Sequence, residues 1–179
     1  MKIRLLIAAL AGAALFAGAV QAQQASTPAG NGGESVPEKL PFDIPYGPPI
    51  SLESARHVLA AAEAEAKKHK WPMNCAVYDS GANLVSFDHM DGAQLGSIAI
   101  AQHKARAAVT FRRPTAAFED GVQKHGATYL MTLDGVIASR GGVPLIEGGK
   151  LIGAIGCSGG IGPQDEAVAT AGAEAISKK

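Results

Sequence analysis

Short links between the predicted strands are the feature that most restricts how this chain folds. Residues 73–79 form a β-type run, and the returning run 84–89 begins after a turn rich in Ser, Gly and Asn. Residues 143–146 and 150–158 flank Gly148-Gly149, which is a second hairpin signal. Because links this short join only antiparallel neighbours, the pattern argues against a parallel nucleotide-binding sheet and favours an antiparallel one.

A third hairpin is predicted around Asp134-Gly135, with strands at 130–133 and 136–139. Helical patterns lie before, between and after these hairpins. Apolar residues at helical spacing, with Ser51 as an N-cap and Pro72 as a stop, predict the first helix. Further helices are predicted in three stretches: 95–111, a short one that begins at 115–119, and 164–177. This order predicts an α+β domain, in which helices pack on an antiparallel sheet of about five strands.

The predicted helix 95–111 carries small side chains on nearly every face. Its alanines include positions 99, 101, 105, 107 and 108. A helix with small residues all round is usually buried, because another backbone can approach it closely. We therefore expect other parts of the protein to cover it, with a second subunit as one candidate.

The first residues carry the pattern of a secretory signal. Lys2 and Arg4 supply positive charge, residues 5–20 carry none, and Val20-Gln21-Ala22 resembles a cleavage site. The apolar run is shorter than the roughly 20 residues that a spanning helix needs, so an uncleaved anchor is the weaker alternative. We expect a signal peptide over 1–22, no membrane span after cleavage, and a periplasmic or secreted protein.

The mature chain is predicted to be a tether followed by one domain. Residues 23–50 are rich in Pro, Gly and Gln, so they read as a linker or an extended arm. Residues 51–179 suffice for one domain of ordinary size. Loss of residues 1–22 removes Lys2 and Arg4 and no acid, so the formal net charge goes from 0 to −2. This charge and the single Trp argue against nucleic acid as a partner.

Cys75 and Cys157 are the only cysteines, and each lies in an apolar β-type run. In an oxidising compartment two thiols can pair, but pairing requires Cα atoms within about 7 Å. Two buried, unpaired thiols are therefore the simpler expectation, and a disulfide is the alternative.

Five motifs occur in one order along the predicted domain. They are VYDSGANLV at 77–85, MDGA at 90–93, IAIAQHKA at 98–105, GGVPL at 141–145, and GAIGCSG at 153–159 followed by Asp165-Glu166. Together they resemble the GlcG/HbpS family, which includes the C-terminal domain of PduO-type proteins, over about residues 51–176. The resemblance implies a profilin-like or roadblock-like α+β fold and a homo-oligomer. It also implies an association with haem or iron, as members include extracellular haem-binding and haem-degrading proteins.

Three residues are candidate ligands for a haem iron, which takes His, Met, Cys or Tyr as an axial ligand. His57 lies opposite the apolar stripe of the first helix, Met90 follows a strand, and His103 lies on the Ala-rich helix. Each is also explained as an ordinary surface or hydrogen-bonded residue. The sequence has no Cys-x-x-Cys-His motif, which excludes covalently attached haem.

A site for a small organic acid is the alternative. His89 and Asp91 would act as an acid/base pair, and Lys104 would hold a substrate carboxylate. Other polar or glycine positions that would contact a ligand are Arg112, Arg140, Gly141, Gly142 and Asp165. Taken singly, each of these residues is more simply explained as part of a turn or of a solvated surface. The sequence shows no clustered His/Cys metal pattern, Gly-x-Ser-x-Gly motif or Walker motif, so the metal content is left open.

The signal pattern predicts an exported protein, and the resemblance implies that it binds haem or a haem-like small molecule, with haem degradation or iron handling as its role. The alternatives are an enzyme acting on a small organic acid and a non-catalytic, oligomeric partner of a sensor.

Overall fold

The computed structural model describes residues 38–40 and 42–177. The description below concerns the unit Lys39–Lys179. The predicted signal peptide and residues 23–37 of the predicted linker lie outside the described residues, so both stay predictions.

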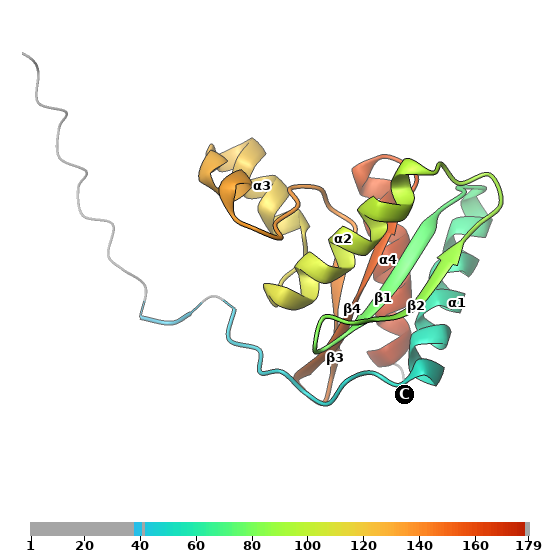
Figure 1. Ribbon diagram of the computed structural model, residues 1–179, viewed down its shortest axis with the longest axis horizontal. Coiled ribbons are helices and arrows are strands. Elements are labelled where there is room, and N and C mark those ends of the chain that lie inside the picture. Colours follow the sequence, from blue (N-terminus) through green and yellow to red (C-terminus); the bar gives the residue numbers. More distant parts are fainter. Residues whose placement is uncertain (1–37, 41, 178–179) are drawn as a thin grey trace, which may run out of the picture. The chain divides into compact units, whose positions relative to one another are not determined.

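Four antiparallel strands form one sheet (Figure 1). The strands are β1 (Asn74–Asp79), β2 (Leu84–His89), β3 (Gly142–Glu147) and β4 (Lys150–Ser158), in the spatial order β2-β1-β4-β3. Short turns join β1 to β2 and β3 to β4, which confirms two of the three predicted hairpins. The long-range pairing of β1 with β4 joins the two hairpins into one sheet. The α+β class is confirmed.

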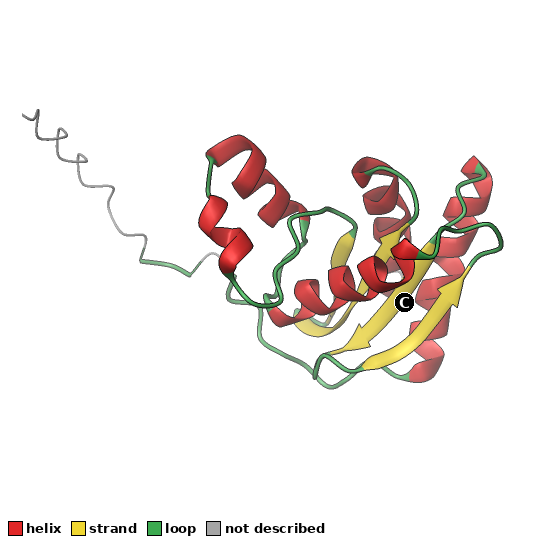
Figure 2. Cartoon of the chain, turned by 45° about the horizontal axis from the view of Figure 1, so that its top comes forward, coloured by secondary structure: helices red, strands yellow, loops and turns green. Residues whose placement is uncertain are grey.

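Helices cover both faces of this sheet (Figures 1 and 2). Helices α1 (Leu52–His69) and α4 (Gly162–Ser177) contact each other on one face, whereas α2 (Gly96–Thr110) lies on the other. A fourth helix, α3 (Ala116–His125), follows α2 in the chain. The Oγ atom of Ser51 accepts a hydrogen bond from the N–H of Ser54 at 3.1 Å, so Ser51 caps α1 as predicted.

The alternation of side chains along β1 divides the core into two parts. Cys75 and Val77 contribute to the cluster between the sheet and α1/α4, while Ala76 and Tyr78 contribute to the cluster under α2. A Cβ atom at Gly156 of β4 would lie only 2.2 Å from the carbonyl oxygen of Ala101. The small residues of α2 therefore allow this helix to rest directly on the sheet backbone.

The third predicted hairpin is wrong. Residues Thr128–Thr132 form a short 3₁₀ helix instead of a strand, although the turn at Asp134-Gly135 does form. Tyr129 and Met131 remain largely exposed, so this segment buries no apolar face that would hold it in a sheet. The neighbouring edge strand β3 also contains Pro144, which lacks an N–H group for pairing with another strand. The sheet therefore has four strands.

The two cysteines form a disulfide, so the expectation of unpaired thiols is wrong. Cys75 of β1 and Cys157 of β4 are directly opposite each other in the sheet, with their Cα atoms 4.2 Å apart. The N–H group of Cys157 donates to the carbonyl of Gly141, on the side away from β1. A non-hydrogen-bonded pair of this kind brings Cα atoms within about 4.5 Å, close enough for a disulfide.

The segment before α1 lies along the domain as an extended arm. Gly47 donates to the carbonyl of Leu151, and Leu151 donates to that of Pro45. Further along, Ile50 donates to the carbonyl of Ile152. These bonds extend the ladder of β4 beyond the point where β1 ends, so residues 45–50 belong structurally to the domain.

Candidate functional site

A buried ion pair lies beneath α2. The Nζ atom of Lys104 is 2.7 Å from Oδ2 of Asp165 in the first turn of α4, and both side chains are almost fully buried. Lys104 Nζ also lies 3.3 Å from the carbonyl oxygen of Cys157. The other carboxylate oxygen of Asp165 accepts from the N–H groups of Gly159 and Gly160, at 3.1 and 2.9 Å. Both charges are therefore matched inside the protein.

Two predicted ligand-contacting glycines pack directly against this pair. Gly141 has a φ of +111°, and a Cβ atom there would lie 2.8 Å from Cβ of Asp165. A Cβ atom at Gly142 would lie 2.4 Å from the carbonyl oxygen of Lys104. The structure thus brings four predicted site residues together, but backbone and side chains already fill the space between them.

Three carboxylates surround Arg140. Its Nε atom lies 2.6 Å from Glu119, and its two terminal nitrogens lie 3.0 Å from Asp120 and Glu166. The pKa of the Arg140 guanidinium is raised, chiefly by the hydrogen bond to Glu119. This arginine ties α3 to α4, and its donors are engaged by the protein itself.

Arg112 holds the extended arm. Its Nη1 donates to the carbonyl of Ile44 at 3.2 Å, and its guanidinium lies 5.6 Å from the ring centre of Tyr46. The hydroxyl of Tyr46 in turn donates to the carbonyl of Thr110 at 2.9 Å, at the end of α2. Arg112 is thus part of the packing between the arm and α2.

His89 belongs to a polar network at the N-terminal end of α2. Its Nδ1 atom is hydrogen-bonded to the side-chain oxygen of Asn74, which is fully buried. Asn74 Nδ2 donates to the carbonyl of Gln94 at 3.1 Å, and Gln94 Nε2 donates to Oγ of Ser97 at 2.7 Å. The hydroxyl of Ser158, at the end of β4, completes the network by donating to the same Oγ at 3.3 Å. The role of Asn74 was not predicted from the sequence, because nothing in the local pattern distinguishes it from an ordinary strand residue.

Asp91 and Met90 lie apart from this network. Both line a shallow hollow of about 310 Å³ together with Lys67, Lys70, Trp71 and Pro72. Within the described part of the chain, Asp91 forms no hydrogen bond or ion pair with His89 or Lys104. The three residues predicted as a catalytic set are therefore placed in separate surroundings.

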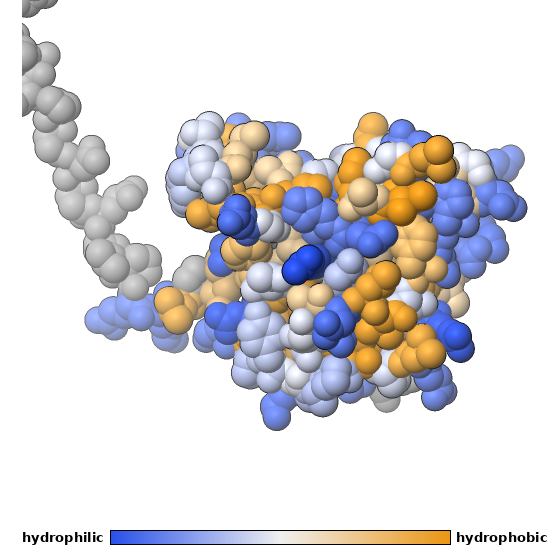
Figure 3. Space-filling view, in the orientation of Figure 1, coloured by the Kyte–Doolittle hydropathy of each residue, from blue (hydrophilic) through white to orange (hydrophobic). Residues whose placement is uncertain are grey.

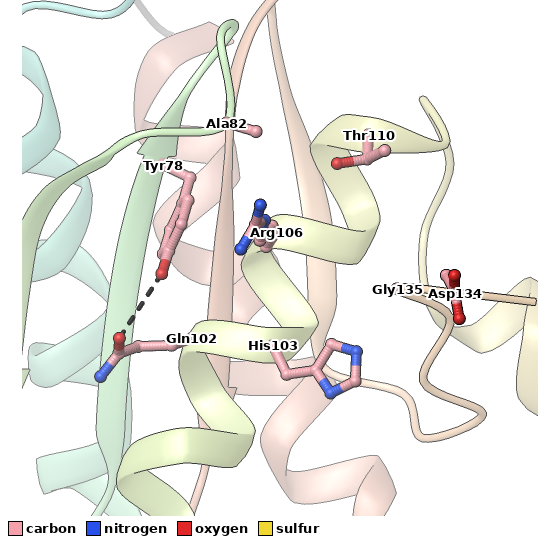
Figure 4. A pocket seen from close by; sticks show the side chains of 8 residues that line it. All are labelled: Tyr78, Ala82, Gln102, His103, Arg106, Thr110, Asp134 and Gly135. Atoms are coloured by element: carbon pink, nitrogen blue, oxygen red, sulfur yellow. Dashed lines mark hydrogen bonds between the residues drawn. The ribbon is translucent and has the colours of Figure 1, made fainter.

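A groove of about 700 Å³ runs along the exposed side of α2 (Figure 4). His103 and Arg106 project from the helix into it, and the loop with Asp134 and Gly135 forms one wall. Tyr78 and Gln102 line the same groove, and the Tyr78 hydroxyl lies 3.4 Å from Oε1 of Gln102. Sequence reasoning singled out His103 but not Arg106, although the two are three residues apart and share one face of the helix.

Apolar surface lies beside the same helix. Figure 3 shows apolar patches over the N-terminal end of α2 and over β2. Leu95 is 77% exposed and Leu84 is 48% exposed, while Phe87 is half-buried. The exposed side of α2 and the neighbouring strand β2 together form the surface that we call the α2/β2 face.

Comparison with known proteins identifies the family. The family model described as "Haem degrading protein HbpS-like" matches residues 50–174. The chain belongs to the HbpS-like family. Protein GlcG of Escherichia coli K12 is 37% identical over 109 residues, which are 61% of this chain and 81% of GlcG.

Solved HbpS-like structures share the fold. The crystal structure of HbpS matches with a TM-score of 0.68 and 29% identity, over 75% of this chain and 94% of that one. The structure of a PduOC:haem complex matches with a TM-score of 0.65 and 27% identity, over 72% of this chain and 95% of that one. The family expected from the five sequence motifs is confirmed, and relatives in it bind haem.

The nitrogen donors of this HbpS-like chain suit a haem iron better than a free metal ion. The described residues contain no cluster of three or more His, Cys, Asp or Glu side chains that would hold a metal ion. A haem iron, by contrast, needs one or two axial ligands, and His57, His89 and His103 are all exposed. His57 lies on α1, on the opposite side of the sheet from α2.

In the described part of the chain, no helix has the length and apolarity required to cross a bilayer.

Proposed function

We propose that this protein binds haem non-covalently on the α2/β2 face. The observation that carries the proposal is the combination, on one surface, of exposed imidazoles with apolar side chains, in a chain whose solved relative binds haem. A porphyrin presents an apolar ring with carboxylates at one edge, so its site requires apolar contacts, cations and an axial donor. The α2/β2 face offers all three.

Arg106 is the residue best placed to receive a propionate. It is exposed on α2 within the groove, and no carboxylate among the described residues is paired with it. Guanidinium groups bind carboxylates through charge-assisted hydrogen bonds, which contribute about 1.5–3 kcal/mol each. When bound, the haem iron would supply redox and Lewis-acid chemistry, while the protein's own residues bind and orient the group.

Spectral titration tests this proposal. Adding haemin to the purified protein should shift the Soret band and saturate near one haemin per chain. Replacing Arg106 by Gln should weaken haemin binding about tenfold through loss of the propionate contact. Arg56→Gln, on the exposed side of α1, should leave the affinity unchanged. A Soret band that stays at the position of free haemin throughout the titration would rule out haem binding.

We also propose that the protein is exported to the periplasm or secreted. The charged start, the apolar run and the small residues at 20–22 support this proposal, as does the Cys75–Cys157 disulfide, since disulfides persist in oxidising compartments. N-terminal sequencing of the exported protein should give Gln23 as the first residue. Recovery of the full-length chain from the cytoplasm alone would contradict export.

A further inference from the structure

The orientation of the Asn74 side chain is determined by its surroundings. Asn74 is fully buried on β1, and its Nδ2 lies 3.1 Å from the carbonyl oxygen of Gln94. A carbonyl oxygen only accepts hydrogen bonds, so the atom facing it must be the amide nitrogen. The amide oxygen of Asn74 is therefore the atom directed toward His89.

This orientation determines where the proton of His89 lies. The amide oxygen of Asn74 has no hydrogen to donate, so the Nδ1 atom of His89 must donate to it. In a neutral imidazole the other nitrogen then carries a free lone pair. The residue is exposed at the end of β2, and within the described part of the chain no group is bonded to its Nε2.

The support behind His89 is rigid. Asn74 is linked through Gln94 to Ser97 in the first turn of α2, and Ser97 is linked to Ser158 on β4. Asn74, Ser97 and Ser158 are all buried, so three elements hold the hydrogen-bond acceptor of His89 in place. Metal-ligating histidines characteristically donate their second ring N–H to such an acceptor, which fixes both the tautomer and the ring direction.

The other exposed candidates lack this arrangement. Neither His57 nor His103 forms a ring hydrogen bond to any described residue. His69 does form one, but through its Nε2 to Glu65 at 3.1 Å, and its ring is stacked on Trp71. Among these four described histidines, His89 is thus the one with an oriented ring and an open Nε2.

We propose that His89 Nε2 is the axial ligand of haem iron on the α2/β2 face, with Asn74 as its positioning residue. This inference rests on the proposed haem-binding function. His89 Nε2 would donate its lone pair to the iron, with no change of oxidation state. Leu95, next to Gln94 in the chain, and Phe87, two residues before His89 on β2, supply apolar surface beside the ligand.

Absorption and electron paramagnetic resonance spectra of three haemin-loaded proteins test this assignment. The wild type should show nitrogen-ligated ferric haem, and His57→Ala, on the opposite side of the sheet, should show the same spectra. His89→Ala should lose the nitrogen-ligated signature and bind haemin at least about tenfold more weakly. Added imidazole should restore the signature in His89→Ala. Unchanged ligation in His89→Ala would overturn the assignment but leave the proposed function intact, whereas a wild type that binds no haemin would overturn the proposed function itself.

The tautomer is measured independently of haem. A long-range ¹H–¹⁵N spectrum of the haem-free wild type should show neutral His89 protonated at Nδ1, and no variant that risks misfolding is required. A neutral His89 protonated at Nε2 would overturn the inference even if haemin binds.

Discussion

At the scale of single residues, Lys104 and Asp165 form the most consequential contact. Removing one partner of a buried ion pair leaves a charge without compensation, which costs about 3–5 kcal/mol. We therefore expect Asp165→Ala to lower the free energy of unfolding by that amount in urea denaturation. Lys67→Ala, which breaks an exposed pair with Glu63, should change it by about 0.5 kcal/mol or less.

A double variant separates the effect of charge balance at this pair from that of the hydrogen bonds made by Asp165. Lys104→Met combined with Asp165→Leu replaces the charged pair by apolar side chains of similar size, which is often tolerated. The double variant should therefore be more stable than Asp165→Ala alone. If it were equally unstable, the hydrogen bonds to Gly159 and Gly160, and not the charge balance, would dominate at this site.

Gly141 gives a second prediction at this scale. Its φ is +111°, and a Cβ atom added there would lie 2.8 Å from Cβ of Asp165, so any side chain is strained. Gly141→Ala should destabilise the protein by about 1–3 kcal/mol. Gly96→Ala, at the start of α2, meets no atom within 4 Å and should be neutral or slightly stabilising. Equal thermal midpoints for the two variants would contradict the strain argument.

Residue types could be predicted from the sequence, but their partners could not. The alanines of helix 95–111 predicted that another backbone approaches this helix closely, and the structure confirms it, because a Cβ atom at Gly156 would lie 2.2 Å from the carbonyl oxygen of Ala101. The partner of Lys104 lies 61 residues away, at a distance that no local pattern encodes. The pairing of His89 with Asn74 was missed for the same reason, because it depends on the register between β1 and β2.

At the scale of elements, the disulfide links the two hairpins across the centre of the sheet. Cys75 and Cys157 are 82 residues apart, and closing a loop of this length restricts the unfolded chain strongly. Reduction should lower the free energy of unfolding by about 2–4 kcal/mol. The Cys75→Ala, Cys157→Ala double variant, measured with and without reductant, should show no such response. A wild type that is equally stable in reductant would contradict this account.

Strand β2 carries a titratable group that opposes folding. Burial raises the pKa of Asp88, and the nearby carboxylate of Glu63 raises it further. A carboxyl whose pKa is higher in the folded state makes stability fall as pH rises through the range just above its ordinary pKa. Asp88→Asn should therefore stabilise the protein slightly at pH 7, by less than about 0.5 kcal/mol because solvent screens this partly exposed side chain, with no gain at pH 3. A gain of the same size at both pH values would show that Asp88 titrates normally.

A β-hairpin could be predicted correctly where turn residues occur next to a strand that is buried. The hairpins β1–β2 and β3–β4 each have turn residues beside one strand that is apolar enough to be buried, β1 or β4, and both hairpins form. The segment 130–139 has an equally good turn at Asp134-Gly135, yet it has no buried face and forms no strand. Turn chemistry alone therefore does not make a hairpin, because the strands also need a surface to pack against.

At the scale of the whole molecule, the sheet separates two surfaces with different roles. The face with α1 and α4 holds the larger apolar cluster, while the α2 side carries the groove, the His89 network and exposed apolar residues. The sequence predicted the family, and through it the haem association, but not which histidine is oriented for binding. Assembly into a homo-oligomer stays a prediction, which sedimentation of the purified protein would test by its mass.

The most direct test of haem binding on the α2/β2 face is a ¹H–¹⁵N correlation spectrum of the labelled protein with substoichiometric haemin. Ferric haem is paramagnetic, so it broadens the amide signals nearest to it, and gallium protoporphyrin serves as the diamagnetic control. We predict signal loss at β2 and at the N-terminal end of α2, centred on His89. Loss centred on α1 and α4, or spread evenly over the domain, would contradict the account.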